Sequence, residues 1–173
     1  MPDPQSKIVT QDELPEMRDD GLVTGICTGC FDILQSGHAV FFQQCKEYVD
    51  RLFVVVGRDS VIQKLKGAGR PINPQNNRLY LVAALEAVDY AVLGDREVRP
   101  GKIDCYNIVE ALRPEKYILN EDDGGLTEKR ELCQSFGMEL VTVPRVVPDF
   151  LEPTSTTEIV RKAAESRAER KKS

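Results

Sequence analysis

Thr28-Gly29-Cys30-Phe31-Asp32-Ile33-Leu34-Gln35-Ser36-Gly37-His38 is the stretch from which the rest of the chain is interpreted. An apolar run from Leu22 to Cys27 precedes it, and residues 37 to 49 follow with apolar side chains at helical spacing. The stretch brings glycines, hydroxyls, a carboxylate and the single histidine of the protein to a predicted strand-to-helix junction. Glycines that allow close approach, followed by the free N–H groups of a helix start, indicate a phosphate site.

Strands and helices alternate along the remainder of the sequence. We predict strands at 52–57, 90–93, 116–119 and 139–143, and helices at 59–65, 76–87, 103–112 and 126–136. This order predicts an α/β fold with a doubly wound, open parallel sheet of the Rossmann-like kind. Ligands of such sheets collect where the strand order reverses. We therefore expect the loop after Cys27, the loop after Gly57 and the loop before Ser155 to meet.

The N-terminal piece from Lys7 to Leu14 is predicted to be a short extended segment and a capped helical turn, with Thr10 as the cap and Glu13 three residues later. We expect this piece to pack on the outside of the main fold. The composition, 173 residues with 41% hydrophobic, fits one domain spanning residues 1–173. A frayed N-terminal segment and a basic C-terminal tail from about residue 163 are expected at its ends.

Charge and cysteine content narrow the class of protein. A net charge of −5 argues against non-specific nucleic-acid binding, and no apolar segment reaches the length of about 20 residues that crosses a bilayer. Five scattered cysteines predict reduced thiols in a cytoplasmic protein. Cys27 and Cys30 form a C-x-x-C, but without a second pair or a further histidine we expect no metal site made by protein side chains.

Several side chains are candidates for binding phosphate. His38 can donate a hydrogen bond from the first turn of its helix, and Gly29 can let the backbone approach an anion. Phe31 is expected to pack, while Asp32 can either hold its loop through backbone hydrogen bonds or contact ligand. Lys66 and Arg70 lie in a flexible basic loop suited to phosphates. Hydroxyls and free amides at a helix start, which bind anions or simply cap the helix, are offered by Ser155, Thr156 and Thr157.

Three of these motifs, in order, resemble a known family. Gly29-Cys30-Phe31-Asp32, Gly37-His38 and Ser155-Thr156-Thr157 resemble the G-x-F-D, H-x-G-H and S-T-T motifs of cytidylyltransferase-like nucleotidyltransferases. The segments 7–10, 65–73 and 83–90 are similar to those of the adenylyltransferases of bacterial heptose activation. The resemblance covers about residues 7 to 162.

The resemblance implies transfer of AMP from ATP to a sugar 1-phosphate, heptose 1-phosphate first, with release of pyrophosphate. It also implies Mg²⁺ accompanying ATP or CTP, a homodimer, and no nucleic-acid or membrane partner. A cytidylyltransferase for glycerol 3-phosphate or a similar phospho-alcohol is the alternative. The catalytic residues it implies are His38, Lys66 and Gln35. The nucleotide-binding residues it implies are Thr28, Gly29, Cys30, Phe31, Gly37, His38, Arg70, Arg78, Asn120, Ser155, Thr156 and Thr157.

Gln35 is the main departure from the family pattern, because the first motif histidine falls at this position. Glutamine donates and accepts hydrogen bonds but carries no positive charge. The loss of one such donor typically costs about 2.7–4 kcal/mol of transition-state stabilisation. A catalytically weakened nucleotide-binding regulatory protein therefore stays open as a further alternative.

Overall fold

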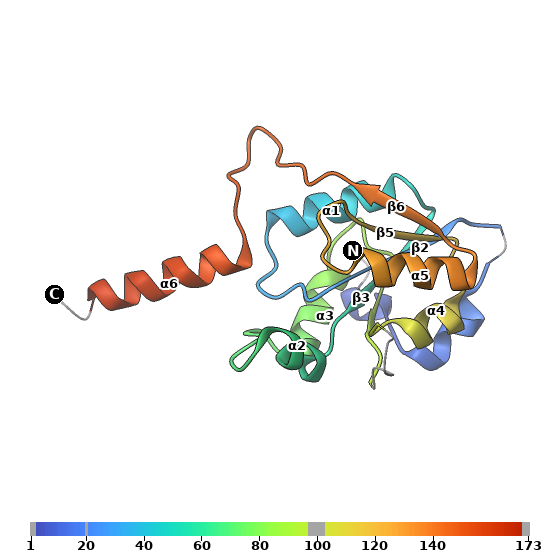
Figure 1. The fold of residues 1–173 in the computed structure, drawn as a ribbon, viewed down its shortest axis with the longest axis horizontal. Helices are drawn as coiled ribbons and strands as arrows, with labels where there is room; N and C mark the ends of the chain where they lie inside the picture. The colour runs from blue at the N-terminus through green and yellow to red at the C-terminus, as the bar shows by residue number, and fades with distance from the viewer. Residues whose placement is uncertain (1–2, 20, 97–102, 171–173) are drawn as a thin grey trace.

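The computed structural model describes residues 3–19, 21–96 and 103–170, and within them strands and helices alternate as expected (Figure 1). The strands are β1 (Ile8–Val9), β2 (Thr24–Gly29), β3 (Arg51–Val56), β4 (Tyr90–Leu93), β5 (Lys116–Asn120) and β6 (Glu139–Val143). The α-helices are α1 (Ser36–Lys46), α2 (Asp59–Lys66), α3 (Gln75–Ala83), α4 (Tyr106–Leu112), α5 (Leu126–Phe136) and α6 (Thr156–Arg170). Two 3₁₀ helices, η1 (Pro4–Lys7) and η2 (Gln11–Met17), flank β1.

All pairings in the sheet are parallel, and the strand order is β1-β4-β3-β2-β5-β6. From β2 the chain winds outward to β3 and β4, then returns to place β5 and β6 on the other side of β2. The order therefore reverses between β2 and β5. The expected α/β fold with a doubly wound parallel sheet is confirmed, and the ligand position that such a reversal creates lies beyond the ends of these two strands.

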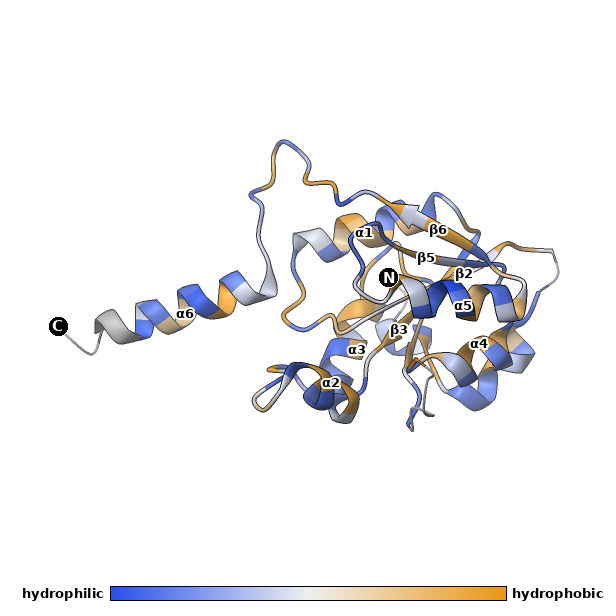
Figure 2. Ribbon diagram, in the orientation of Figure 1, coloured by the Kyte–Doolittle hydropathy of each residue, from blue (hydrophilic) through white to orange (hydrophobic). Residues whose placement is uncertain are grey.

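Helices cover both faces of the sheet, as Figures 1 and 2 show. One core layer packs α1 and α3 against the sheet through side chains such as Phe42 and Val82, both fully buried. The other packs η2, α4 and α5 against the opposite face through Leu14, Ile108 and Leu132. Strands enclosed on both sides explain the continuous apolar run of β3, which is buried from Leu52 to Val56.

The predicted boundaries of α5 and β6 agree with the structure to the residue. The N-terminal piece was expected outside the main fold, and this was wrong: Ile8 and Val9 pair with Ala91 and Val92 as an edge strand. The capping box of Thr10 and Glu13 at the start of η2 is confirmed.

Further boundaries differ from expectation, and the helix predicted at 37–49 ends at Lys46. Thr28 and Gly29 still belong to β2, because they pair with Val55 and Val56. Helix α3 ends at Ala83 rather than at residue 87. Turns follow it, and Lys7 Nζ donates to the Leu85 and Val88 carbonyls in these turns (3.1 and 2.7 Å). The helix expected at 103–112 begins only at Tyr106.

The C-terminal helix α6 extends away from the body of the molecule (Figure 1), and its surface is mainly hydrophilic (Figure 2). It continues to Arg170, so most of the predicted basic tail is helical here, and residues 171–173 lie outside the described residues. Among the described residues, no helix combines the length and the apolar character needed to cross a membrane.

Candidate active site

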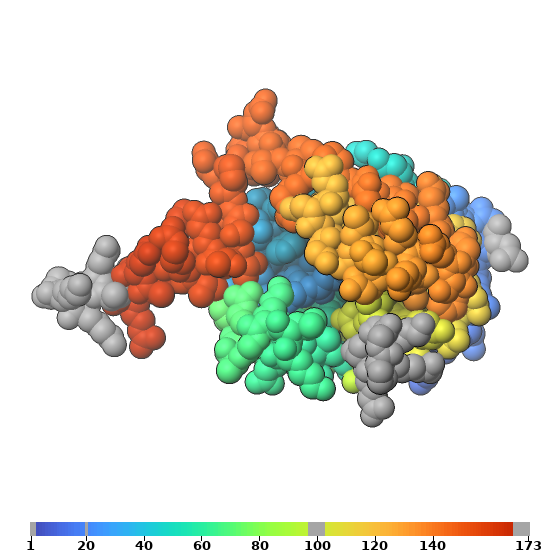
Figure 3. Space-filling model, viewed as in Figure 1, coloured from blue at the N-terminus to red at the C-terminus, as the bar shows by residue number. Residues whose placement is uncertain are grey.

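A cleft of about 190 Å³ opens at the carboxyl edge of the sheet where the strand order reverses. Thr28 and Gly29 at the end of β2 and Leu119 and Asn120 at the end of β5 form its floor. In Figure 3 the blue atoms of the segment after β2 lie recessed between the green loop after α2 and the red start of α6. The other lining residues are Cys30, Phe31, Asp32, Gly37, His38, Phe41, Lys66, Arg70, Asp123, Arg145 and Thr156. Most of the sequence-predicted site residues therefore meet in one place.

The loop after β2 is held in an uncommon backbone conformation. Phe31 and Ile33 have positive φ values of 48° and 51°, which side-chain-bearing residues rarely adopt. The Phe31 ring is buried and packs on Phe42, with centroids 5.0 Å apart, as its expected packing role requires. A Cβ at Gly29 would lie 2.7 Å from that ring, so glycine is needed there to admit Phe31. The tight loop thereby brings its backbone into the cleft.

His38 occupies the first turn of α1 and faces the cleft. The Gln35 backbone N–H donates to His38 Nδ1 at 3.2 Å. Burial, reinforced by the positive charges of Arg145 and Lys66, lowers the pKa of His38 to about 4. The imidazole is therefore neutral at pH 7, and because Nδ1 accepts a hydrogen bond, the proton resides on Nε2. His38 can thus donate from Nε2 to an anion.

Gln35 takes a different place from the one that the motif implied. It is the N-cap of α1, and its Oε1 accepts a hydrogen bond from the Gly37 N–H at 3.1 Å. Its side chain lines a second pocket beside the His38 cleft rather than the cleft itself. In this arrangement glutamine performs a capping role that needs an acceptor and no positive charge.

Asp32 fixes the basic loop after α2. Its carboxylate is 2% exposed and accepts hydrogen bonds from the Ile72 and Asn73 N–H groups, each at 2.9 Å. Arg70 Nη2 lies 3.3 Å from the same carboxylate. Asp32 was expected either to hold its own loop or to contact ligand, but its carboxylate instead holds the distant 70–73 segment. Arg70 is thereby kept at the cleft, which Lys66, the last residue of α2, also lines.

Arg78, which the resemblance assigns to phosphate, is completely buried and does not line the cleft. Its guanidinium donates to the carbonyls of Asn73 (2.9 Å), Gly57 (2.7 Å) and Cys30, and Nη2 lies 2.6 Å from Asp59 Oδ1. These contacts tie the loop after β2, the end of β3 and the basic loop to one cation. Arg78 therefore stabilises the loops that form the cleft without lining the cleft itself.

The start of α6 reaches the cleft through one of its three predicted residues. Thr156 lines the cleft and donates from Oγ1 to the Asp32 carbonyl at 2.9 Å. Ser155 caps the helix, accepting the Glu158 N–H at 3.2 Å, so the expected cap is present. Ser155 and Thr157 are exposed and do not line the cleft in this arrangement.

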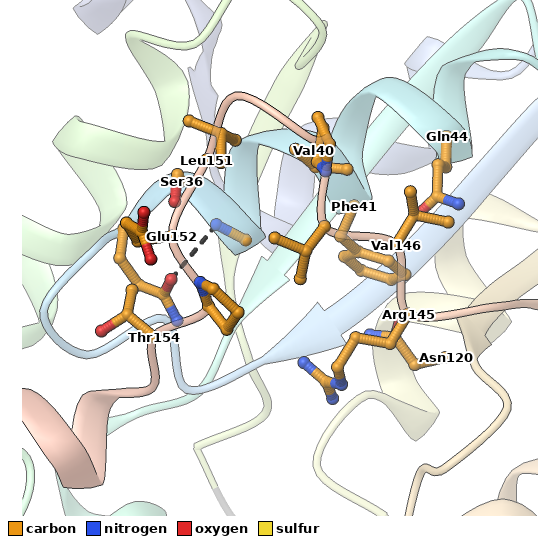
Figure 4. Close-up of a pocket in the computed structure, with 15 residues that line it drawn as sticks. Ser36, Val40, Phe41, Gln44, Asn120, Arg145, Val146, Leu151, Glu152 and Thr154 are labelled. Carbon is orange, nitrogen blue, oxygen red and sulfur yellow. Dashed lines mark hydrogen bonds between the residues drawn. The ribbon is translucent and has the colours of Figure 1, made fainter.

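The second pocket lies between α1 and the segment 144–154 (Figure 4). Apolar side chains line it: Val40 and Phe41 from α1, and Val146 and Leu151 from the segment after β6. Gly37, Phe41, Asn120 and Arg145 border both this pocket and the His38 cleft. A pocket of mixed apolar and polar lining thus adjoins a cleft rich in cations, an arrangement that can receive a base joined to phosphates.

Arg145 is a site residue that the sequence reasoning missed. It follows β6, borders both cavities and forms two 3.0 Å hydrogen bonds with Asp122. These bonds raise the pKa of Arg145 and lower that of Asp122, so both groups are charged. A basic residue immediately after the last predicted strand was the available signal, since the ends of parallel strands share one edge.

The acidic segment after β5 contributes to the wall of the cleft. Asp123 lines it, with Lys129 Nζ 2.7 Å from its carboxylate. Among the described residues, no group of three or more His, Cys, Asp or Glu side chains could hold a metal ion. Because Mg²⁺ usually binds through one or two carboxylates together with substrate phosphates, the residues present fit an ion carried mainly by a nucleotide.

Comparisons with known proteins agree with this geometry. The sequence model described as cytidylyltransferase-like matches residues 26–162. The bifunctional protein HldE of Nitratiruptor sp. is 38% identical over 134 residues, which are 78% of this chain and 26% of that protein. HldE of Campylobacter fetus is 32% identical over 158 residues, 91% of this chain and 31% of that protein. The chain thus spans between a quarter and a third of the length of these relatives.

Solved structures share the fold. The lipopolysaccharide core biosynthesis protein from Thermoplasma volcanium superposes with a TM-score of 0.63 at 29% identity, covering 73% of this chain and 100% of that one. The pantoate–β-alanine ligase from Francisella tularensis, with a TM-score of 0.58 and 13% identity over 88% of this chain and 75% of that one, shows a similarity of fold alone.

Proposed function

The chain belongs to the cytidylyltransferase-like family, and from this premise we propose that it transfers AMP from ATP to a sugar 1-phosphate, with heptose 1-phosphate as the first candidate. The observation that carries the proposal is the neutral His38 in a cleft that Lys66, Arg70 and Arg145 also line, with a second, partly apolar pocket adjoining it. The resemblance of the segments 7–10, 65–73 and 83–90 to heptose adenylyltransferases, together with the similarity to a lipopolysaccharide core biosynthesis protein, supports the sugar phosphate as acceptor.

In the proposed reaction, an oxygen of the sugar phosphate attacks the α-phosphorus of ATP. The bond from that phosphorus to the bridging oxygen breaks, and pyrophosphate leaves with the electron pair. The adenine is proposed to occupy the pocket of Val40, Val146 and Leu151, which places the phosphates toward His38.

The chain then has to position two anions and stabilise the charge that builds on them. His38 Nε2–H donates to a phosphoryl oxygen, and a neutral donor there does not lose its proton to the substrate. Lys66 and Arg70 bind phosphate oxygens from the basic loop, and Arg145 binds them from the boundary between the cleft and the pocket. Mg²⁺, entering with the triphosphate, would supply additional positive charge on the phosphate oxygens.

A pyrophosphate-release assay tests the proposal. The enzyme is supplied with each nucleoside triphosphate alone, each sugar 1-phosphate or polyol phosphate alone, and each pair. We expect release only with a pair, and most with ATP and a heptose 1-phosphate. Turnover with CTP and glycerol 3-phosphate would select the cytidylyltransferase alternative, whereas no turnover with any pair would overturn the proposal.

The regulatory alternative rests on Gln35, which replaces a histidine of the family motif. It requires tight nucleotide binding by calorimetry without pyrophosphate release. Because Gln35 already caps α1 and does not line the His38 cleft, we expect Gln35→His to gain little activity and His38→Ala to lose most of it. A large gain in Gln35→His would instead identify the wild-type chain as a weakened enzyme.

A further inference from the structure

A cavity of about 510 Å³, larger than the His38 cleft, lies at the carboxyl ends of β1 and β4. Among the residues that the structure describes, it shares no lining residue with the His38 cleft or with the pocket beside it. Its floor is apolar, formed by Val9 of β1, Val92 of β4 and Leu79 of α3. A volume of this order accommodates a small molecule.

Two arginines border this cavity. Arg58, directly before α2, donates from Nε to the Gly94 carbonyl at 2.6 Å, which fixes its guanidinium at the end of β4. The remaining N–H groups of Arg58 make no hydrogen bond or ion pair with any other residue in the described part of the chain. Arg96, exposed on the same cavity, also has no such partner there.

Two acidic side chains, Asp95 and Asp12, also lie near these arginines. Asp95, 1% exposed, accepts hydrogen bonds from Gln11 Nε2 (3.1 Å) and the Asn107 N–H (2.9 Å). Asp12 borders the cavity from the start of η2 and forms no ion pair with Arg58 or Arg96. Burial and the nearby charge of Arg96 lower the pKa of Arg58, against the opposing effect of Asp95. An anion between the two guanidinium groups would relieve their repulsion.

We propose that this cavity binds a small phosphomonoester, with its phosphate held by Arg58 and Arg96 and its hydroxyl groups facing Thr10, Gln11 and Asp12. The planar guanidinium matches a phosphate with two parallel hydrogen bonds. The Thr10 hydroxyl, the Gln11 amide and the Asp12 carboxylate, which also line the cavity, suit the hydroxyls of a polyol or sugar. This assignment does not depend on the proposed transferase activity, because the two sites are made of different residues.

Hydrogen–deuterium exchange of the whole chain locates the ligand. The probes are glucose 1-phosphate, inorganic phosphate and, as the uncharged control, glucose. With glucose 1-phosphate we expect protection of peptides covering residues 8–12 and 90–96, in addition to any protection of 28–38 in the His38 cleft. Protection confined to 28–38, or no protection, would overturn the proposal. Equal protection by glucose would overturn the role of the phosphate.

Variants test the two arginines. In Arg58→Gln/Arg96→Gln we expect protection of 8–12 to disappear and the calorimetric dissociation constant of that site to rise at least ten-fold, while protection of 28–38 persists. Arg58→Lys, which keeps the charge but loses the planar fork, should weaken binding less. Arg130→Gln/Arg161→Gln, which replaces two exposed arginines away from the cavity, is the charge-matched control. A change of under two-fold in the double variant, with an unchanged melting temperature, contradicts the assignment.

The source of the ligand follows from the same samples. If a phosphomonoester slows the exchange of residues 8–12 and is consumed when ATP is added, the cavity binds a substrate of the enzyme. One that protects 8–12 and is not consumed is a separate ligand. Both results support the site, and a failure of the transferase assay leaves the exchange result intact.

Discussion

Replacing Asp32 by asparagine removes the negative charge and one acceptor oxygen that serve its three partners, two N–H groups and Arg70, while the side chain keeps its shape. At 2% exposure the carboxylate accepts the Ile72 and Asn73 N–H groups at 2.9 Å and faces Arg70 at 3.3 Å. The asparagine oxygen can keep one backbone partner. Its NH₂ group then opposes the other N–H, which is left buried without an acceptor.

A hydrogen bond to a charged group contributes about 1.5–3 kcal/mol, so we expect Asp32→Asn to lower the free energy of unfolding by that amount. For a chain of this size the melting temperature should fall by about 3–12 °C. Loosening of the 70–73 loop also displaces Arg70 from the cleft, so the KM for a phosphorylated substrate should rise about ten-fold or more. Urea denaturation measures the first effect and initial rates of pyrophosphate release measure the second.

Glu16→Gln, a carboxylate-to-amide change on the exposed surface of η2, is the matched control and should shift stability by less than about 0.5 kcal/mol. Arg70→Gln combined with Asp32→Asn completes a double-mutant cycle, and the two substitutions should be non-additive because their side chains are in contact. If Asp32→Asn matches wild type in both unfolding and KM, the carboxylate does not hold the loop and our reasoning is refuted.

The remaining predictions concern histidine, the buried arginine and the cleft rim. Burial lowers the pKa of His38 to about 4, so as the pH falls the histidine is protonated in the unfolded chain before it is protonated in the folded chain. Up to about 3 kcal/mol of the free energy of unfolding present above pH 6.5 should therefore be lost as the pH falls toward 4. His38→Gln should lack this loss, and the single histidine makes an NMR titration unambiguous. Arg78→Met should lower the free energy of unfolding, measured by urea denaturation, by about 3–5 kcal/mol, because three carbonyls lose their donor and the half-exposed Asp59 loses its ion pair, while exposed Arg130→Met should cost almost nothing. Arg145→Gln should raise the KM for ATP about ten-fold with an unchanged melting temperature; an unchanged KM would exclude Arg145 from the nucleotide site.

Much of the fold could be predicted because the apolar pattern is local and strong. The helix 126–136 ends at Gly137, which adopts the left-handed conformation that terminates helices, and the strand at 139–143 follows directly. The errors occurred where a distant contact sets a boundary. Lys7 holds the carbonyls after α3, and β4 recruits Ile8 and Val9 as an edge strand. Neither contact leaves a periodic signal in the sequence.

The candidate site divides in the same way. The motif around His38 and the basic residues Lys66 and Arg70 could be selected from residue type, turn chemistry and family resemblance. Their functional roles are still predictions. What residue type could not reveal is which polar groups already have partners inside the protein, as Arg78 does behind the cleft.

Hydrophobic periodicity lies in consecutive residues, so it was enough to predict the alternation of strands and helices and hence the carboxyl edge on which a ligand would collect. Two roles became visible only in the folded chain: Asp32 holds a loop 40 residues away, and Arg145 lines the cleft from the segment after β6. The physical reason is that each of these roles depends on which distant donor or acceptor meets the side chain when the sheet closes.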